Sequence, residues 1–162
     1  MQYTAKVSEV QEIVSVRESL EAVLKGFGFN LIELAVSRHR GSVQVRAVIY
    51  NGASIGIDDC SRAHRAITPR LELAFPGQDI YLEVSSPGIN RHIKDGAEFA
   101  YYTGRGVRCY RTDISDWTAG ILDSADEKGI VIKTNEEAVR LDFDIIAKAL
   151  LSDSKAGSSQ EV

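Results

Sequence analysis

The chain has 162 residues, of which 44% are apolar and 26% are charged, and its formal net charge is −4. This length fits one domain or two small ones, and the composition is that of a globular protein, which excludes the disordered and fibrous classes. No apolar run approaches the roughly 18 residues of a membrane-spanning helix and no secretory signal opens the chain, so we expect a cytoplasmic protein that does not associate with membranes. The two cysteines, Cys60 and Cys109, lie in no CxxC or Cys/His array, which excludes a disulfide framework and a structural zinc site.

The N-terminal part of the chain opens with a predicted helix followed by a predicted hairpin. Apolar residues spaced mostly by three and four predict a helix over 7–27, which the glycines around its end would terminate. Runs rich in apolar and β-branched residues predict strands over 31–38 and 43–50. The loop 39–42 between them contains a glycine and is typical of an antiparallel hairpin.

A second helix and a third strand complete this part of the chain. The helix is expected from an N-cap at Asp58 to about Ala74, with a kink or a boundary at Pro69. The third strand is expected over 80–85. Two helices can cover one face of a three-stranded sheet. We therefore predict an N-terminal domain over 1–88 with the order α-β-β-α-β, a two-layer, KH-like arrangement.

The C-terminal part of the chain has the pattern of a small β-domain. After the Ser-Pro-Gly break at 86–88, a short helix is expected over 95–102. Turn residues then separate four strand-like runs, at 107–112, 117–124, 130–134 and 138–141. Short strands at this spacing predict an SH3/Sm-like β-barrel over 89–151, which makes the whole chain α+β. Residues 152–162, rich in serine, glycine and charge, are expected to form a disordered tail.

The net charge of −4 conceals an uneven distribution of charge. Residues 36–70 have six arginines against two aspartates and a net charge of +4, residues 89–111 have +3, and residues 112–162 have −6. One interpretation is scatter over solvated surfaces. The other is a basic middle of the chain that faces anionic RNA and an acidic end that faces a basic partner.

The residues that could perform chemistry do not assemble into a catalytic or metal site. The three histidines fall at no metal-ligand spacing, no serine lies in a GxSxG elbow, and no dinucleotide-binding or Walker loop is present. We therefore expect no enzyme, no metal and no cofactor. A nucleic-acid-binding module is a better candidate, although the chain lacks the GxxG clamp of KH domains and the stacking aromatics of an RRM. Arginines without a stacking platform favour phosphate contact over sequence reading.

The run from Tyr81 to Arg91, YLEVSSPGINR, is the most specific signal in the sequence. It resembles the LEVSSPGLxRPL signature of the bacterial ribosome maturation factor RimP family. The resemblance extends from the first helix to about Leu151, through IDDC at 57–60, EF at 98–99, AGIL at 119–122 and DIIAKA at 144–149. His92 stands where the family usually has proline. Since proline would fix the backbone there, its absence predicts larger interdomain motion than in relatives that have it.

This resemblance implies a non-enzymatic assembly factor with an α/β N-terminal domain and an SH3-like C-terminal barrel. Such a factor binds the immature small (30S) ribosomal subunit and assists its late assembly, including the incorporation of a small-subunit ribosomal protein. The expected partners are therefore the subunit precursor and a basic ribosomal protein, with rRNA as a further candidate, and the chain is expected to be a monomer. The alternative is a general RNA-binding or RNA-chaperone module, which would follow RNA into any particle.

Two groups of candidate contact residues follow from the charge pattern. Contact with rRNA or the ribosome is assigned to Arg38, Arg40, Arg46 and Arg91. Arg91 comes directly after a rigid turn and is well placed for a phosphate or a carboxylate, whereas the arginines beside the hairpin loop could equally be solvated. Contact with the basic ribosomal protein is assigned to acids in predicted turns of the barrel, Asp126, Glu127, Glu136 and Glu137.

The Ser-Pro-Gly break is assigned to the interdomain junction. Ser85 and Ser86 are expected to offer their hydroxyls to nearby backbone groups, Pro87 to hold the residue before it extended, and Gly88 to allow a turn. A structural junction explains the motif without any ligand, and direct contact of the motif with a partner is the alternative.

Overall fold

The structure, a computed structural model, describes the backbone of residues 2–152 and the side chains of residues 11–152. The chain divides into two units, with the division between Pro87 and Gly88. The first unit combines helices with a sheet and the second is built on an antiparallel sheet, so the fold is α+β. Whether each unit folds alone stays a prediction.

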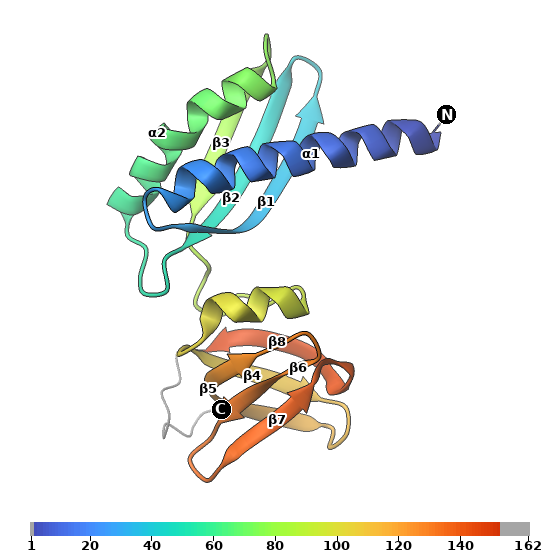
Figure 1. Cartoon of the computed structure of the whole chain (residues 1–162), viewed down its shortest axis with the longest axis vertical. Coiled ribbons are helices and arrows are strands. Elements are labelled where there is room, and N and C mark those ends of the chain that lie inside the picture. The colour runs from blue at the N-terminus through green and yellow to red at the C-terminus, as the bar shows by residue number, and fades with distance from the viewer. Residues whose placement is uncertain (1, 153–162) are drawn as a thin grey trace. The chain divides into compact units, whose positions relative to one another are not determined.

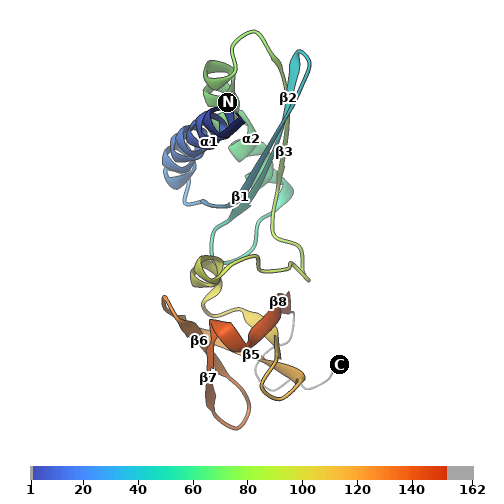
Figure 2. The same cartoon turned by 90° about the vertical axis from the view of Figure 1, so that its right-hand side faces the viewer.

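The first unit has the predicted order of two helices and three strands. Its elements are α1 (Gln2–Lys25), β1 (Asn30–His39), β2 (Ser42–Tyr50), α2 (Ile57–Ala74) and β3 (Asp79–Ser85). The sheet has the order β1-β2-β3, in which β1 and β2 are antiparallel and β2 and β3 are parallel. Both helices lie on the same face of this sheet (Figures 1 and 2). The opposite face of the sheet is left without a helix from this unit.

The core of the first unit lies between the helices and the sheet. Val43, Ala47 and Ile49 of β2 alternate toward the helices and are fully buried, as the period of a strand requires. Helix residues spaced by four, such as Leu20 and Leu24, fill the other side of this core. Burial of each such large apolar side chain contributes about 1.5–3 kcal/mol. The amphipathic pattern read from the sequence therefore follows from a single buried face on each element.

The start of α2 differs from the prediction. The N-cap is Gly56, not Asp58, and the helix begins at Ile57. The Asp59 carboxylate accepts a hydrogen bond from the Gly56 N–H at 3.0 Å, so the acid of the first helical turn closes this end. The predicted boundary at Pro69 is also wrong, because α2 continues through this residue to Ala74.

The second unit is a five-stranded antiparallel sheet with two short 3₁₀ helices. Its elements are η1 (Gly96–Tyr102), β4 (Gly106–Arg111), β5 (Asp116–Ala125), β6 (Gly129–Lys133), β7 (Ala138–Asp142), η2 (Phe143–Ile145) and β8 (Ile146–Ser152). The strand order is β7-β6-β5-β4-β8. The four predicted strands are confirmed, whereas β8 was not predicted as a strand. Ser152 ends β8 instead of starting a tail, and residues 153–162 lie outside the described residues.

Two glycines allow the strands of the second unit to approach closely. A Cβ atom at Gly120 would lie 2.3 Å from the Lys133 carbonyl oxygen, and one at Gly129 would lie 2.3 Å from that of Leu141. The interior of the same sheet contains Cys109, and burial raises the pKa of its thiol to about 12. This cysteine is therefore a packing residue with little thiolate at neutral pH. In the described part of the chain, none of the helices has the length and apolar character needed to cross a membrane.

Candidate functional site

The Ser-Pro-Gly motif follows directly on the end of β3. Ser85 is the last residue of that strand, and the Arg91 N–H donates to the Gly88 carbonyl at 3.0 Å, which forms the turn expected from the sequence. Ser86 and Pro87 are half-buried. In the part of the chain that the structure describes, the hydroxyls of Ser85 and Ser86 make no hydrogen bond. Their predicted bonds to backbone groups are therefore wrong for the described residues; both serines instead line a groove.

This groove has a volume of about 570 Å³ and lies between the start of α2 and the end of β3. Both serines line it, together with Ile57, Cys60 and His64 of α2. His64 Nε2 lies 3.2 Å from the carbonyl oxygen of Leu82 in the edge strand. The groove thus places the motif beside a helix start, with hydroxyl, thiol and imidazole groups along its wall.

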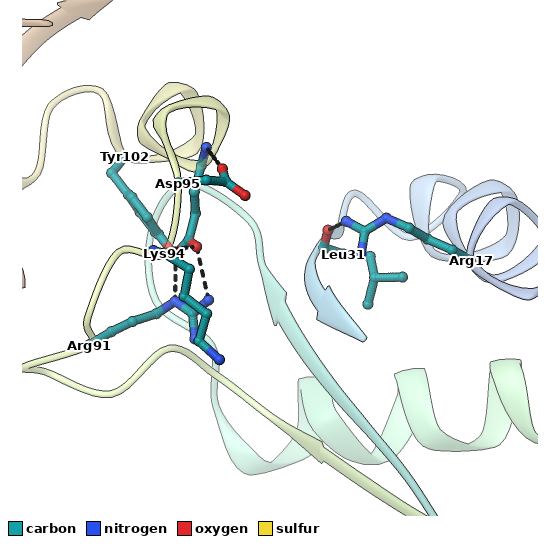
Figure 3. Close-up of polar contacts among 7 residues, drawn as sticks. Arg17, Leu31, Arg91, Lys94, Asp95 and Tyr102 are labelled. Atoms are coloured by element: carbon teal, nitrogen blue, oxygen red, sulfur yellow. Dashed lines mark hydrogen bonds and ion pairs between the residues drawn. The ribbon is translucent and has the colours of Figure 1, made fainter. Parts of the chain in front are cut away.

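Arg91 has a carboxylate partner within its own unit. Its Nε and Nη2 atoms donate to Glu98 Oε2 and Oε1 at 2.6 and 3.0 Å, and the two side chains are only 9% and 5% exposed. The Tyr102 hydroxyl donates to the same carboxylate at 2.8 Å, and the Lys94 N–H donates to it at 3.2 Å. Figure 3 shows Arg91, Lys94 and Tyr102 converging on this point. Glu98 therefore accepts hydrogen bonds from all three residues.

The Glu98 cluster, as we call Arg91, Lys94, Glu98 and Tyr102, was missed by the sequence reasoning. The four-residue spacing of Glu98 and Tyr102 on a predicted helix was the available signal, since such residues share a face. Burial, followed by the bond to Glu98, raises the pKa of the Tyr102 hydroxyl well above its usual value. The role predicted for Arg91 in contacting rRNA stays untested. The structure assigns its guanidinium a structural role, because the bidentate pair is nearly buried.

Backbone pairing fixes the segment after the turn to the sheet of the second unit. The Ile93 N–H donates to the Ala149 carbonyl and the Leu151 N–H donates to the Arg91 carbonyl, both at 2.9 Å. His92 faces Leu150 in an isolated antiparallel bridge. The flanking residues make the hydrogen bonds of this bridge, so backbone pairing holds the segment to the sheet with histidine at position 92.

The three arginines of the first unit that were predicted to contact rRNA do not form one surface. Arg38 forms an ion pair with Glu12 of α1, and its Cζ lies 5.1 Å from the ring centroid of Phe75 at the end of α2, so it points to the helical side of the sheet. Arg40 lies in the exposed turn between β1 and β2. Arg46 lies between two core residues of β2 and therefore faces the opposite side.

Arg46 lies instead in a groove on the helix-free face of the first sheet. This groove has a volume of about 590 Å³, and its wall also includes Gln44 and the exposed Tyr81. Gln44 and Tyr81 are register partners across β2 and β3, and Glu83 pairs with Arg46 in the same way. A carboxylate therefore stands beside the arginine, which reduces the positive potential that a phosphate would meet there.

The four predicted turn acids of the second unit fall into two separate pairs. Asp126 and Glu127 lie in the β5–β6 turn, whereas Glu136 and Glu137 lie in the β6–β7 turn. These turns are at opposite ends of β6, whose five residues span about 16 Å. All four acids are exposed. They can act on a partner only as two distinct contact points.

Of the four predicted turn acids, Asp126 is the one whose carboxylate is bonded within its own unit. Its carboxylate accepts bonds from Arg140 Nη1 at 2.6 Å and from the N–H groups of Lys128 and Gly129 at 2.8 and 3.0 Å. These donors, Arg140 first, hold the pKa of Asp126 well below its usual value. Much of its charge is thus compensated within the turn. Among the described residues, no group of three or more His, Cys, Asp or Glu side chains could hold a metal ion.

Comparison with known proteins identifies the class of this two-unit α+β chain. Residues 19–90 match the family model of the RimP N-terminal domain. Three relatives, each named ribosome maturation factor RimP, come from Borrelia turicatae, Borrelia hermsii and Borrelia recurrentis. They are 29%, 30% and 28% identical to this chain. The first two matches each cover 82% of this chain and 91% of the relative, and the third covers 91% and 99%.

The chain is therefore similar to assembly factors over nearly all of its length. It belongs to the ribosome maturation factor RimP family. This confirms the resemblance drawn from the LEVSSPG run, and it supports a role in ribosome maturation.

Proposed function

We propose that this chain assists late assembly of the small (30S) ribosomal subunit by binding its precursor and a basic ribosomal protein. The observation that supports this most strongly is the match to ribosome maturation factors over 82–91% of the chain. On this proposal the protein acts in the cytoplasm as a monomer and is not an enzyme.

The proposal assigns different partners to the two units. The first unit is taken as a KH-like domain over 1–88, supported by its α-β-β-α-β order. It would contact rRNA through Arg40 and Arg46, which are exposed. The second unit is taken as an SH3/Sm-like barrel over 89–151, supported by its five-stranded antiparallel sheet. It would contact the basic ribosomal protein through its exposed turn acids.

Sedimentation of the native protein tests this function. We expect it to co-sediment with small-subunit precursors and to leave large subunits and mature ribosomes free. A strain without the protein should accumulate small-subunit precursors with unprocessed rRNA, most clearly during fast growth. A protein that follows RNA into every particle would instead be the general RNA-binding module. A normal gradient with mature rRNA ends in the deletion strain would contradict the assembly role.

The turn acids offer a test of the protein partner. Replacing Glu136 and Glu137 by glutamine should slow association with the basic ribosomal protein, because complementary charge mainly raises the association rate. Added salt should produce the same loss. Replacing Asp126 and Glu127 should have the smaller effect, since Arg140 already compensates Asp126. Association that ignores both salt and these substitutions would mean that the acidity only keeps the protein soluble.

A further inference from the structure

An aromatic and basic patch lies on the outer face of the second sheet, apart from every residue assigned above. On β4, Arg108 and Tyr110 alternate with the fully buried Val107 and Cys109, so their side chains face outward. Trp117 of β5 is the register partner of Tyr110. The alternation of β4 and the pairing of β4 with β5 therefore bring three large side chains together on one surface.

The three side chains are in direct contact. The rings of Tyr110 and Trp117 are 5.4 Å apart between centroids and inclined at 74°, an edge-to-face arrangement. The Cζ atom of Arg108 lies over the Trp117 ring, 4.8 Å from its centroid. Trp117 nevertheless keeps 37% of its surface exposed. The indole is thus held in place on two sides while a substantial part of it remains open to solvent.

A second cation extends this patch across the neighbouring strand. Lys148 of β8 is the register partner of Tyr110 on its other side, and it is exposed. Within the described residues, no carboxylate forms an ion pair or hydrogen bond with the side chain of Arg108 or Lys148. Arg111, the last residue of β4, is already paired with Asp113 at 2.7 Å. In the described part of the chain, two cations without a carboxylate partner therefore flank the exposed aromatic surface.

We propose that this Trp117 face, composed of Arg108, Tyr110, Trp117 and Lys148, binds single-stranded RNA. Unpaired bases stack on aromatic rings and on arginine guanidinium planes, while lysine and arginine neutralise the phosphates that link those bases. A duplex cannot use this face in the same way because its bases are stacked on each other. An acidic protein segment would use the cations but would gain little from the ordered Arg108–Trp117 stack.

This inference deepens the proposed function, on which it rests for the source of the RNA. It also changes the assignment of partners, since the second unit, which has the acidic turns, would then contact RNA as well as the basic protein. The acids and the Trp117 face occupy different places: the predicted acids lie in turns that flank β6, whereas the Trp117 face is formed by β4, β5 and β8. One unit could therefore contact a basic protein and RNA at separate points.

The experiment uses the fluorescence of the intact chain. Trp117 is the only tryptophan of the sequence, so its emission reports this face alone. We expect single-stranded ten-nucleotide oligoadenylate and oligouridylate RNA to quench the emission, and a ten-base-pair RNA duplex to quench it much less. If the single strands leave the emission unchanged, or if an oligoglutamate peptide quenches it as strongly as they do, the proposal is overturned.

Variants measured by the anisotropy of a labelled oligonucleotide complete the test. Trp117→Ala should weaken binding at least about 5-fold, the lower end of the loss seen for a stacking residue. Trp117→Phe, which keeps a ring and the fold, should lose less RNA affinity than Trp117→Ala. Arg108→Gln should weaken binding and reduce the slope of log K against log salt by about 0.7. Lys133→Gln is the matched control, because it removes one exposed charge from β6 of the same unit and should change neither quantity.

Wild-type affinity in Trp117→Ala, or equal losses in Arg108→Gln and Lys133→Gln, would refute a stacking site. These binding measurements contain no ribosomal particle. A protein that binds small-subunit precursors in gradients but shows none of these effects would keep the proposed function and lose this inference. A protein that shows these effects but does not bind small-subunit precursors would support the RNA-binding face and contradict the assembly role.

Discussion

Removal of the Glu98 carboxylate should destabilise the second unit strongly. In Glu98→Ala, Arg91 keeps its charge in a site where its side chain is only 9% exposed, and it loses both hydrogen bonds of the bidentate pair. The Tyr102 hydroxyl and the Lys94 N–H lose the same acceptor. Breaking a buried ion pair from one side costs about 3–5 kcal/mol. For a unit of this size such a loss lowers the melting temperature by at least about 12 °C.

Urea denaturation followed by two signals measures this loss in the intact chain. Trp117 fluorescence reports the second unit, and circular dichroism at 222 nm reports mainly the long helices α1 and α2 of the first. The fluorescence transition should move to lower urea while the helical signal moves less. Glu136→Ala is the control, since its side chain is exposed, and it should change the free energy of unfolding by no more than about 0.5 kcal/mol.

A double variant separates the charge from the packing. In Arg91→Met with Glu98→Leu, no buried charge remains, so the second unit should regain part of the stability that Glu98→Ala loses. A loss below about 1 kcal/mol in Glu98→Ala would refute the reasoning, because it would mean that solvent reaches Arg91 freely. A double variant less stable than Glu98→Ala would assign the effect to cavity formation instead.

Three further predictions concern single positions. His92→Pro should fold and should be as stable as the wild type or up to about 1 kcal/mol more stable, because the hydrogen bonds of its bridge belong to the flanking residues; a large loss in thermal denaturation would contradict this. Tyr102 has a raised pKa, so its proton is retained in the folded state while the unfolded chain loses it. Stability should therefore fall as the pH rises above the ordinary value of 10.0, and this fall should be smaller in Tyr102→Phe than in Tyr101→Phe when melting is measured across that range. Gly129→Ala should destabilise the second unit by well over 1 kcal/mol in urea denaturation, because the new methyl would lie 2.3 Å from the Leu141 carbonyl oxygen, whereas Gly88→Ala, with open space around it, should not.

The helices and strands of the first unit can be predicted closely from its sequence because each of these elements buries one face. The helices and strands of residues 2–85 match the apolar periodicity within a few residues, including the hairpin turn, where Gly41 has a φ of 77°. The start of α2 could not be placed from the identity of Asp58 alone. Asp58 and Asp59 are both good first-turn residues, and only the backbone geometry decides which one reaches the Gly56 N–H.

The second unit contains a strand, β8, that local sequence patterns do not predict. The strand β8 has the sequence IAKALLS, in which alanine, lysine and leucine favour helix over strand. Its extended form is imposed by pairing with β4, about 40 residues earlier in the chain. Contacts of this range are not encoded in local propensity, so the sequence predicts four strands of this sheet and misses the last one.

The difference between local sequence and long-range contacts also explains which parts of the candidate sites could be predicted. Arg91 was expected to meet a phosphate or a carboxylate, and the carboxylate is in its own chain, presented by a 3₁₀ helix that starts at Gly96. The Trp117 face was missed because Arg108 and Trp117 come together only through the register of β4 and β5. The chemistry of a residue can be read from its type, whereas its partner depends on how the chain folds, both for the nearby pair of Arg91 and Glu98 and for Arg108 and Trp117 on neighbouring strands.

The position of β8 determines when the second unit can form during synthesis. At Leu150 this strand pairs with β4 on one side and with His92 on the other, so two earlier segments depend on the last strand to be made. Translation at 5–20 residues per second separates the emergence of His92 from that of Leu150 by about 3–12 s. During this interval the residues of the first sheet have all left the ribosome, while residues 91–93 have no strand to join. A message truncated before the codon for Ile146 would therefore yield a second unit that lacks the strand paired with β4 and with His92.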